Sequence, residues 1–174
     1  MKLWKFCKEL LPVKIAAIVV AILLVTISFI PTFRASVFDA VSAIYGSVLV
    51  GLTNKDRATQ NISELKVNPL LEKAAQAKAD DMAKNGYFSH NTPDGKTPWY
   101  FIKESGYKYV YAGENLAVNF IDSDEVHKAW MNSPTHRLNI INPRYTEIGI
   151  ATSTGTYKGR AAIFVVQMFG TPAQ

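Results

Sequence analysis

The order of the periodic patterns along the chain constrains the fold more than any other feature. Apolar residues first recur at helical spacing, at Leu71, Ala74, Ala75, Ala79 and Met82. Residues 147–153 and 161–169, near the C-terminus, are rich in β-branched side chains, and residues 155–159 are predicted to join them as a hairpin turn. Helices precede strands without alternation. The sequence therefore predicts an α+β fold with an antiparallel sheet.

Capping residues set the limits of three predicted helices. Asn68 is a candidate N-cap for the first helix, and Gly86 is its predicted end, since glycine adopts the left-handed conformation without strain. A shorter helix is predicted from Pro98 to Gly106. Asp122 is a candidate cap for a helix that ends near residue 131. We find no internal repeat or linker after residue 54.

The N-terminus has the pattern of a membrane anchor. Residues 15–33 carry no charge and lie between Lys14 and Arg34. A helix of this length spans roughly 29 Å, close to the hydrocarbon thickness of a bilayer. The lysines before it predict a cytoplasmic segment at residues 1–14 and an extracytoplasmic remainder. This predicts a single-pass cell-membrane protein, with a juxtamembrane segment at 34–47 and a domain at 48–172. Cleavage of a signal peptide and secretion is the alternative.

A second apolar segment, residues 40–52, leaves another topology open. As a return span it would move the domain to the cytoplasm, but it is short and contains several polar or small residues. We favour the interpretation that residues 48–58 open the domain as a buried helix. The only cysteine, Cys7, cannot form a disulfide within the chain, and it is either inert or a candidate for acylation.

Most of the net charge of +5 comes from the first forty residues, which contain five basic and two acidic side chains. From residue 54 onward basic and acidic residues nearly balance, so the domain has no charge pattern typical of nucleic-acid binding.

Three polar side chains are the candidate site residues: His90, Glu114 and His136. Each has a structural explanation when taken alone, and Glu114 lies in a Gly-Glu-Asn segment that we interpret as a turn. Together, two imidazoles and a carboxylate suit Zn²⁺ with an open position, or a general acid/base cluster around water. The sequence contains no Gly-x-Ser-x-Gly elbow and no phosphate-binding loop.

Other polar residues have simpler interpretations. His127 is predicted to be solvated, on the helix face away from Val126 and Trp130. Glu147 is predicted to pair with a surface base at the start of a strand. Ser133, before a proline, is predicted to end or cap a helix.

A series of motifs resembles the CAP superfamily, which comprises cysteine-rich secretory proteins, antigen 5 and pathogenesis-related 1 proteins (SCP domains). The motifs occur in the family's order and cover about residues 48–172: Asn54-x-x-Arg57, Leu71-x-x-Ala74-Ala75-x-x-Lys78-Ala79, Tyr87-Phe88-Ser89-His90, Gly113-Glu114-Asn115-Leu116-Ala117, Ala129-Trp130-Met131-x-Ser133-Pro134-x-His136-Arg137 and Thr146-Glu147-Ile148-Gly149-Ile150. The chain is similar to a bacterial, membrane-anchored member.

The resemblance implies a three-layer α-β-α sandwich with a central antiparallel sheet. It also implies a cleft with His90 and His136 as a histidine pair and Glu114 as one acid, which in some relatives binds zinc or another divalent metal. The family's second acid falls at the position of Ser133 here, which weakens any mechanism that needs two carboxylates. No single activity transfers with this fold.

Three functions follow as hypotheses. The first is a membrane-tethered binding module whose cleft holds a divalent metal or a small-molecule, lipid or cell-envelope ligand. The second is a metal-assisted hydrolase of cell-envelope or secreted polymers, in which His90 and His136 are metal ligands and the catalytic residue Glu114 positions or deprotonates water. The third is an adhesion domain with an empty cleft.

Overall fold

The computed structural model describes residues 31–120 and 122–173. It divides into two compact units, Met1–Ala40 and Val41–Gln174, and the description below concerns the second. The predicted cytoplasmic segment and all but the last three residues of the predicted anchor, 15–33, lie outside the described residues. Within the two described ranges, no helix has both the length and the apolar character needed to cross a bilayer.

Helices and strands follow one another in a mixed order. They are α2 (Pro31–Thr59), β1 (Lys66–Val67), α3 (Pro69–Asn85), α4 (Pro98–Ser105), β2 (Tyr109–Val118), α5 (Ser123–Asn132), α6 (Pro134–Ile140), β3 (Glu147–Tyr157) and β4 (Arg160–Pro172).

The four strands form one sheet in the order β1-β3-β4-β2. β4 pairs antiparallel with β3 and with β2, whereas β1 pairs parallel with β3. The prediction of a purely antiparallel sheet is therefore wrong at one edge. The strand at this edge, β1, has only two residues, and so short a segment has no sequence pattern that would predict a strand or its direction.

The hairpin between β3 and β4 is tighter than predicted. The strands continue to Tyr157 and Arg160, so only Lys158 and Gly159 turn the chain. Both have positive φ, 50° and 75°, which suits a two-residue turn whose twist matches that of the strands.

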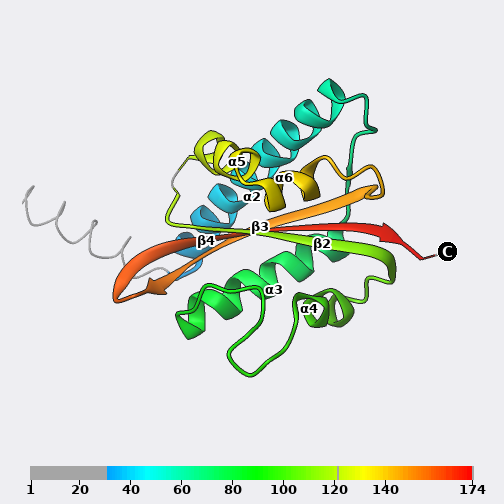
Figure 1. The fold of residues 1–174 in the computed structure, drawn as a ribbon. Coiled ribbons are helices and arrows are strands. Elements are labelled where there is room, and N and C mark those ends of the chain that lie inside the picture. The colour runs from blue at the N-terminus through cyan, green and yellow to red at the C-terminus, as the bar shows by residue number, and fades with distance from the viewer. Residues whose placement is uncertain (1–30, 121, 174) are drawn as a thin grey trace, which may run out of the picture. The chain divides into compact units, whose positions relative to one another are not determined.

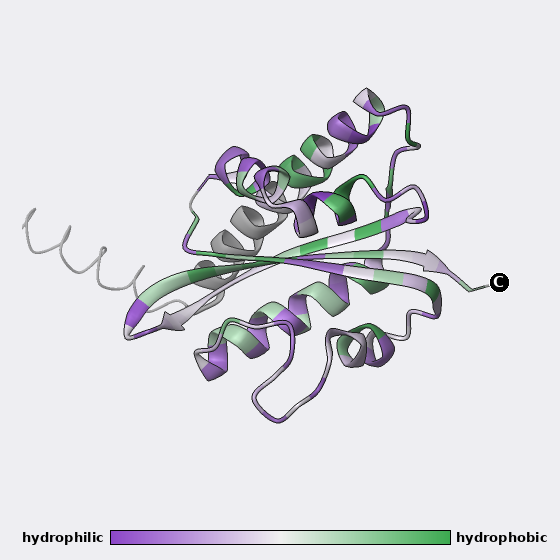
Figure 2. Cartoon of the chain, viewed as in Figure 1, coloured by the Kyte–Doolittle hydropathy of each residue, from purple (hydrophilic) through white to green (hydrophobic). Residues whose placement is uncertain are grey.

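Helices cover both faces of the sheet (Figure 1). α3 and α4 pack on one face, where Phe164, Val166 and Met168 of β4 join their apolar cluster. Val165 and Phe169, at alternate positions of the same strand, join the cluster on the opposite face, with α2, α5 and α6. This alternation is the period of a strand buried on both sides. Hydrophobic residues accordingly gather in the central strands, while the outer turns of α5 are hydrophilic (Figure 2).

The predicted helix boundaries are confirmed. The Asn68 side chain accepts a hydrogen bond from the backbone N–H of Leu70, and Asp122 accepts one from Glu125. Gly86 ends α3 in the left-handed conformation, with φ of 67°. These local signals act within one turn, so they are readable without knowledge of the tertiary structure.

The segment 48–58 is helical, as predicted, although the compact unit that contains it begins at Val41. It forms the C-terminal part of α2, where Leu49, Thr53 and Arg57 recur every four residues and are fully buried. The alternative of a return span at residues 40–52 falls within the same helix, which does not qualify as a membrane span.

Candidate functional site

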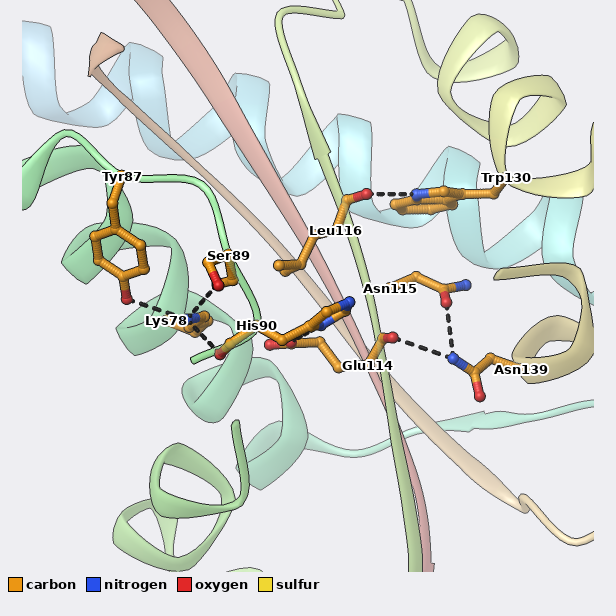
Figure 3. Close-up of polar contacts among 9 residues, drawn as sticks. All are labelled: Lys78, Tyr87, Ser89, His90, Glu114, Asn115, Leu116, Trp130 and Asn139. Atoms are coloured by element: carbon orange, nitrogen blue, oxygen red, sulfur yellow. Dashed lines mark hydrogen bonds and ion pairs between the residues drawn. The ribbon is translucent and has the colours of Figure 1, made fainter. Parts of the chain in front are cut away.

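His90 and Glu114 form a hydrogen-bonded pair at the centre of the candidate site (Figure 3). His90 Nδ1 lies 2.6 Å from Glu114 Oε1. The Glu114 side chain is 1% exposed and that of His90 is 56% exposed. Glu114 comes from the middle of β2, so the predicted Gly-Glu-Asn turn is wrong. β2 continues through this segment because Gly113, Glu114 and Asn115 pair in register with β4.

A buried lysine holds the segment that carries His90. Lys78 of α3 is fully buried, and its Nζ donates hydrogen bonds to the hydroxyl of Tyr87 (3.0 Å) and to the carbonyls of Ser89 (2.9 Å) and His90 (2.8 Å). Figure 3 shows these three bonds fanning out from one ammonium group. Sequence reasoning did not assign Lys78 a role. The available signal was a lysine at the helical spacing of the buried residues of α3.

The electrostatics of the pair follow from this arrangement. The hydrogen bond to Glu114 raises the pKa of His90. Burial raises the pKa of Glu114 and lowers that of Lys78. Because the hydrogen bond joins Glu114 Oε1 to His90 Nδ1, the other imidazole nitrogen points away from the carboxylate. The second carboxylate oxygen, Oε2, is buried without a hydrogen-bond partner within the described part of the chain.

Amide side chains fix β2 against α6. Asn115 is fully buried and donates to the His136 carbonyl (3.2 Å) and to Gln167 Oε1 (3.0 Å). Asn139 of α6 donates to the Glu114 carbonyl (3.1 Å) and to Asn115 Oδ1 (2.9 Å). Because each bond needs residues from distant elements, the sequence alone did not indicate this network.

His136 lies on α6, half-buried. Burial lowers its pKa, and the positive charge of His90 lowers it further. Of the predicted ligand set of His90, His136 and Glu114, the structure pairs His90 with Glu114. Glu114 Oε1 is already bonded to His90, and residues 31–120 and 122–173 contain no group of three His, Cys, Asp or Glu placed to hold a metal.

A surface pocket of about 450 Å³ opens beside the pair, which we call the His90 pocket. Its walls include His90, Trp99, Gly113, Glu114, Asn139 and Tyr145, and they do not include His136. A Cβ at Gly113 would lie 2.5 Å from the Tyr145 hydroxyl, so the glycine is required for this close approach. The pocket combines one imidazole, the two amides of Asn91 and Asn139, and one indole, which suits a polar ligand with an apolar part.

Two predictions about single residues are wrong. His127 is buried, and its Nε2 lies 2.7 Å from Asp56 Oδ2, because α2 packs over that face of α5. Glu147 has no ion pair with a base among residues 31–120 and 122–173. Its Oε2 accepts hydrogen bonds from Asn68 (3.0 Å) and from the Tyr107 hydroxyl (2.6 Å). Ser133 is confirmed as a helix-end residue, between α5 and α6.

The pair predicts a measurable pKa difference. We expect His90 to titrate above its ordinary value of 6.5, and Glu114→Gln to lower the His90 pKa because the amide carries no negative charge. The raised pKa means that the pair contributes stability below pH 6.5, and that this stability is lost as the pH rises through the folded-state value. Nuclear magnetic resonance titration of the imidazole signals measures the His90 pKa in the wild type and in Glu114→Gln.

The same titration contains an internal control. His136 should titrate below 6.5, the opposite direction. Equal His90 pKa values in the wild type and in Glu114→Gln would contradict the pairing.

Comparison with known proteins places this geometry in a family. Residues 50–169 match the sequence model of the cysteine-rich secretory protein family, CAP. An uncharacterized protein of Bacillus subtilis (strain 168), YkwD, is 40% identical over 132 residues, which cover 76% of this chain and 49% of that protein. YlbC, described as an uncharacterized membrane protein of the same organism, is 28% identical and is matched over 63% of this chain and 32% of its own length.

Solved structures agree with the sequence match. The crystal structure of an extracellular protein containing a SCP domain from Bacillus anthracis has a TM-score of 0.66 and 27% identity, covering 76% of this chain and 42% of that one. The chain thus spans half or less of the length of these three relatives. The family match covers most of the chain, including most of the sheet and of its covering helices, and the paired His90 and Glu114. This chain belongs to the cysteine-rich secretory protein (CAP) family.

Proposed function

We propose that this chain is a ligand-binding CAP domain, and that the His90 pocket takes a polar fragment of the cell envelope. The observation that carries the proposal is the solvent-open imidazole of His90, held in one orientation by the buried carboxylate of Glu114. A ring fixed in this way loses little freedom on binding, and its outward nitrogen is available to a ligand atom. The Asn139 amide and the Trp99 indole supply a second polar contact and an apolar surface.

We also propose that residues 15–33 tether the domain outside the membrane. The support is the uncharged segment with lysines on its N-terminal side, together with relatives described as a membrane protein and as an extracellular protein. Secretion after cleavage of the segment is the alternative.

Metal binding stays a prediction, and we now assign only the two histidines, His90 and His136, as ligands. His90 has one ring nitrogen bonded to Glu114, so Glu114 would orient a ligand rather than serve as one. His90 and His136 then supply two ligands, one fewer than the three protein ligands typical of a catalytic zinc.

Hydrolysis of an envelope polymer is the second candidate function. In the pair, the Glu114 carboxylate orients the His90 imidazole, as a positioning residue orients a general base. This arrangement favours activation of water by His90. The assignment differs from the sequence prediction, in which His90 was a metal ligand and Glu114 positioned or deprotonated the water. The buried Glu114 side chain does not reach solvent, so His90 is the better placed of the two.

One titration tests these functions. The full-length chain is titrated first with peptidoglycan fragments released by a muramidase and then with zinc acetate, while the imidazole and indole signals are followed by nuclear magnetic resonance. We expect the fragments to shift the His90 and Trp99 signals in the wild type and to leave the Trp99 signal unmoved in His90→Ala. Cleavage of the fragments in the same spectra, abolished in His90→Ala, would identify a hydrolase.

His136→Ala is the matched control for the pocket. It removes a nearby imidazole that does not line the pocket, so fragment binding should persist. Zinc-induced shifts of both histidines, lost in either variant, would establish the two-histidine site. Fragments that leave the His90 and Trp99 signals unmoved at saturation would refute the binding proposal.

A further inference from the structure

A second and larger hollow is lined by residues of α4, of the start of β2 and of the segments beside them. Its volume is about 810 Å³. Six side chains supply its chemistry: Lys96, Trp99, Tyr100, Lys103, Lys108 and Tyr109. We refer to it as the aromatic–lysine hollow. The backbone N–H of Ala173 donates to the Lys108 carbonyl and closes one side. None of the lining residues is acidic.

Two aromatic rings of this hollow are open to solvent, while Tyr109 is half-buried and Tyr107, which also lines the hollow, is buried. Trp99 and Tyr100 are each 39% exposed, although both are large enough to contribute strongly to a core. The ring centroids of Trp99 and Tyr109 are 6.4 Å apart, with an angle of 46° between the planes. The two rings therefore present inclined apolar faces rather than one stacked pair. Exposed aromatic residues grouped in a concavity are typical of a recognition surface.

The lysines give the hollow a positive charge. Lys103 and Lys108 are exposed and have no carboxylate within ion-pair distance among the described residues. Lys96 is different, because it pairs with Asp94 at 2.9 Å and lies 4.9 Å from the centroid of the Tyr100 ring. Two unneutralised ammonium groups beside apolar ring faces select a ligand that carries both negative charge and flat apolar surfaces.

We propose that the aromatic–lysine hollow binds an acidic polysaccharide, with sugar rings on Trp99 and Tyr109 and acidic groups on Lys103 and Lys108. A nucleic acid is the less favoured ligand, because its backbone needs a positive groove that follows several phosphates. From residue 54 onward the chain carries 14 basic and 12 acidic residues, which leaves little charge for such a groove. The hollow shares Thr97 and Trp99 with the His90 pocket, yet the proposal does not require that pocket to hold a ligand.

Isothermal titration calorimetry of the full-length chain with an oligogalacturonate tests this site. The methyl-esterified oligosaccharide has the same rings without the charges, and we expect it to bind at least about tenfold more weakly. Binding of the acidic form should weaken as salt is added, since the lysines are exposed. Absence of measurable binding by the acidic form would overturn the proposal.

Variants locate the binding. Lys103→Gln/Lys108→Gln and Trp99→Ala should each weaken binding about tenfold. The matched control, Lys55→Gln/Lys128→Gln, removes the same charge from α2 and α5 on the opposite face of the sheet, and it should change affinity less than about twofold. An equal loss in both lysine pairs would indicate a general charge effect and overturn the assignment.

Two further arms separate this site from its alternatives. His90→Ala should leave oligogalacturonate binding unchanged. If this variant no longer binds the oligosaccharide, the ligand occupies the His90 pocket and the assignment to the hollow is wrong. If an oligothymidylate binds with the same dependence on Lys103, Lys108 and Trp99 while the oligogalacturonate does not, the hollow is a nucleic-acid site and the proposal fails.

Discussion

Replacing Arg57 with alanine is expected to lower the free energy of unfolding by about 4 kcal/mol. The Arg57 side chain is fully buried at the end of α2. Its guanidinium donates to four backbone carbonyls, those of Ser63 (2.8 Å), Ile140 (2.9 Å), Asn142 (2.8 Å) and Tyr145 (3.0 Å). Alanine would leave these carbonyls without their donors and open a large cavity.

The size of the effect follows from what the guanidinium connects. Three of the four carbonyls belong to the end of α6 and the segment before β3, so the guanidinium ties the end of α2 to this connection. The same segment supplies Tyr145 to the wall of the His90 pocket. Burial lowers the pKa of Arg57, but arginine remains charged at neutral pH, so its donors are permanently available.

Urea denaturation measures the loss for Arg57→Ala. Arg57→Lys should recover only part of it, because one ammonium cannot reproduce the planar fork. Arg160→Ala, at the exposed hairpin, is the control and should change stability by less than about 0.5 kcal/mol. A loss below about 1 kcal/mol in Arg57→Ala would show that water satisfies these carbonyls and that the guanidinium is not a structural centre.

Replacing Gly149 with alanine is expected to cost about 3 kcal/mol. Gly149 lies on β3 where α3 crosses the sheet. A Cβ there would lie 2.2 Å from the backbone nitrogen of Glu72 and 2.2 Å from the carbonyl carbon of Leu71. Both are backbone atoms, so no rotamer change relieves the overlap and α3 must move away from the sheet. That displacement disturbs packing along the helix that also carries Lys78.

Gly51→Ala is the matched control for this substitution. Gly51 lies within α2, and, apart from its chain neighbours and the adjoining helix backbone, no described atom lies within 4 Å of the position that an alanine methyl group would occupy. Alanine there should raise stability by about 0.5–1 kcal/mol through its higher helix propensity. Thermal or urea unfolding of the two variants gives the comparison. If both substitutions change stability in the same direction, the close approach of α3 to β3 is not a determinant of stability.

The α+β class, the limits of α3, α4 and α5, and the family were all predictable from the sequence. Helix caps such as Asn68 and Asp122 act on a backbone N–H two or three residues away, so their effect is encoded locally. The alternation in β4 was equally readable, since it depends only on the period of a strand. The three candidate site residues were identified by their place in motifs, and the structure pairs His90 with Glu114.

The tertiary structure alone decided the roles of the polar residues. Sequence reasoning placed Glu114 in a turn and left His127 in solvent, because neither the register of β2 with β4 nor the packing of α2 over α5 has a local signature. Lys78 and Arg57 differ from surface residues only in what surrounds them. A buried charge is stable where groups distant in sequence satisfy every donor, and that condition is set by the assembled fold.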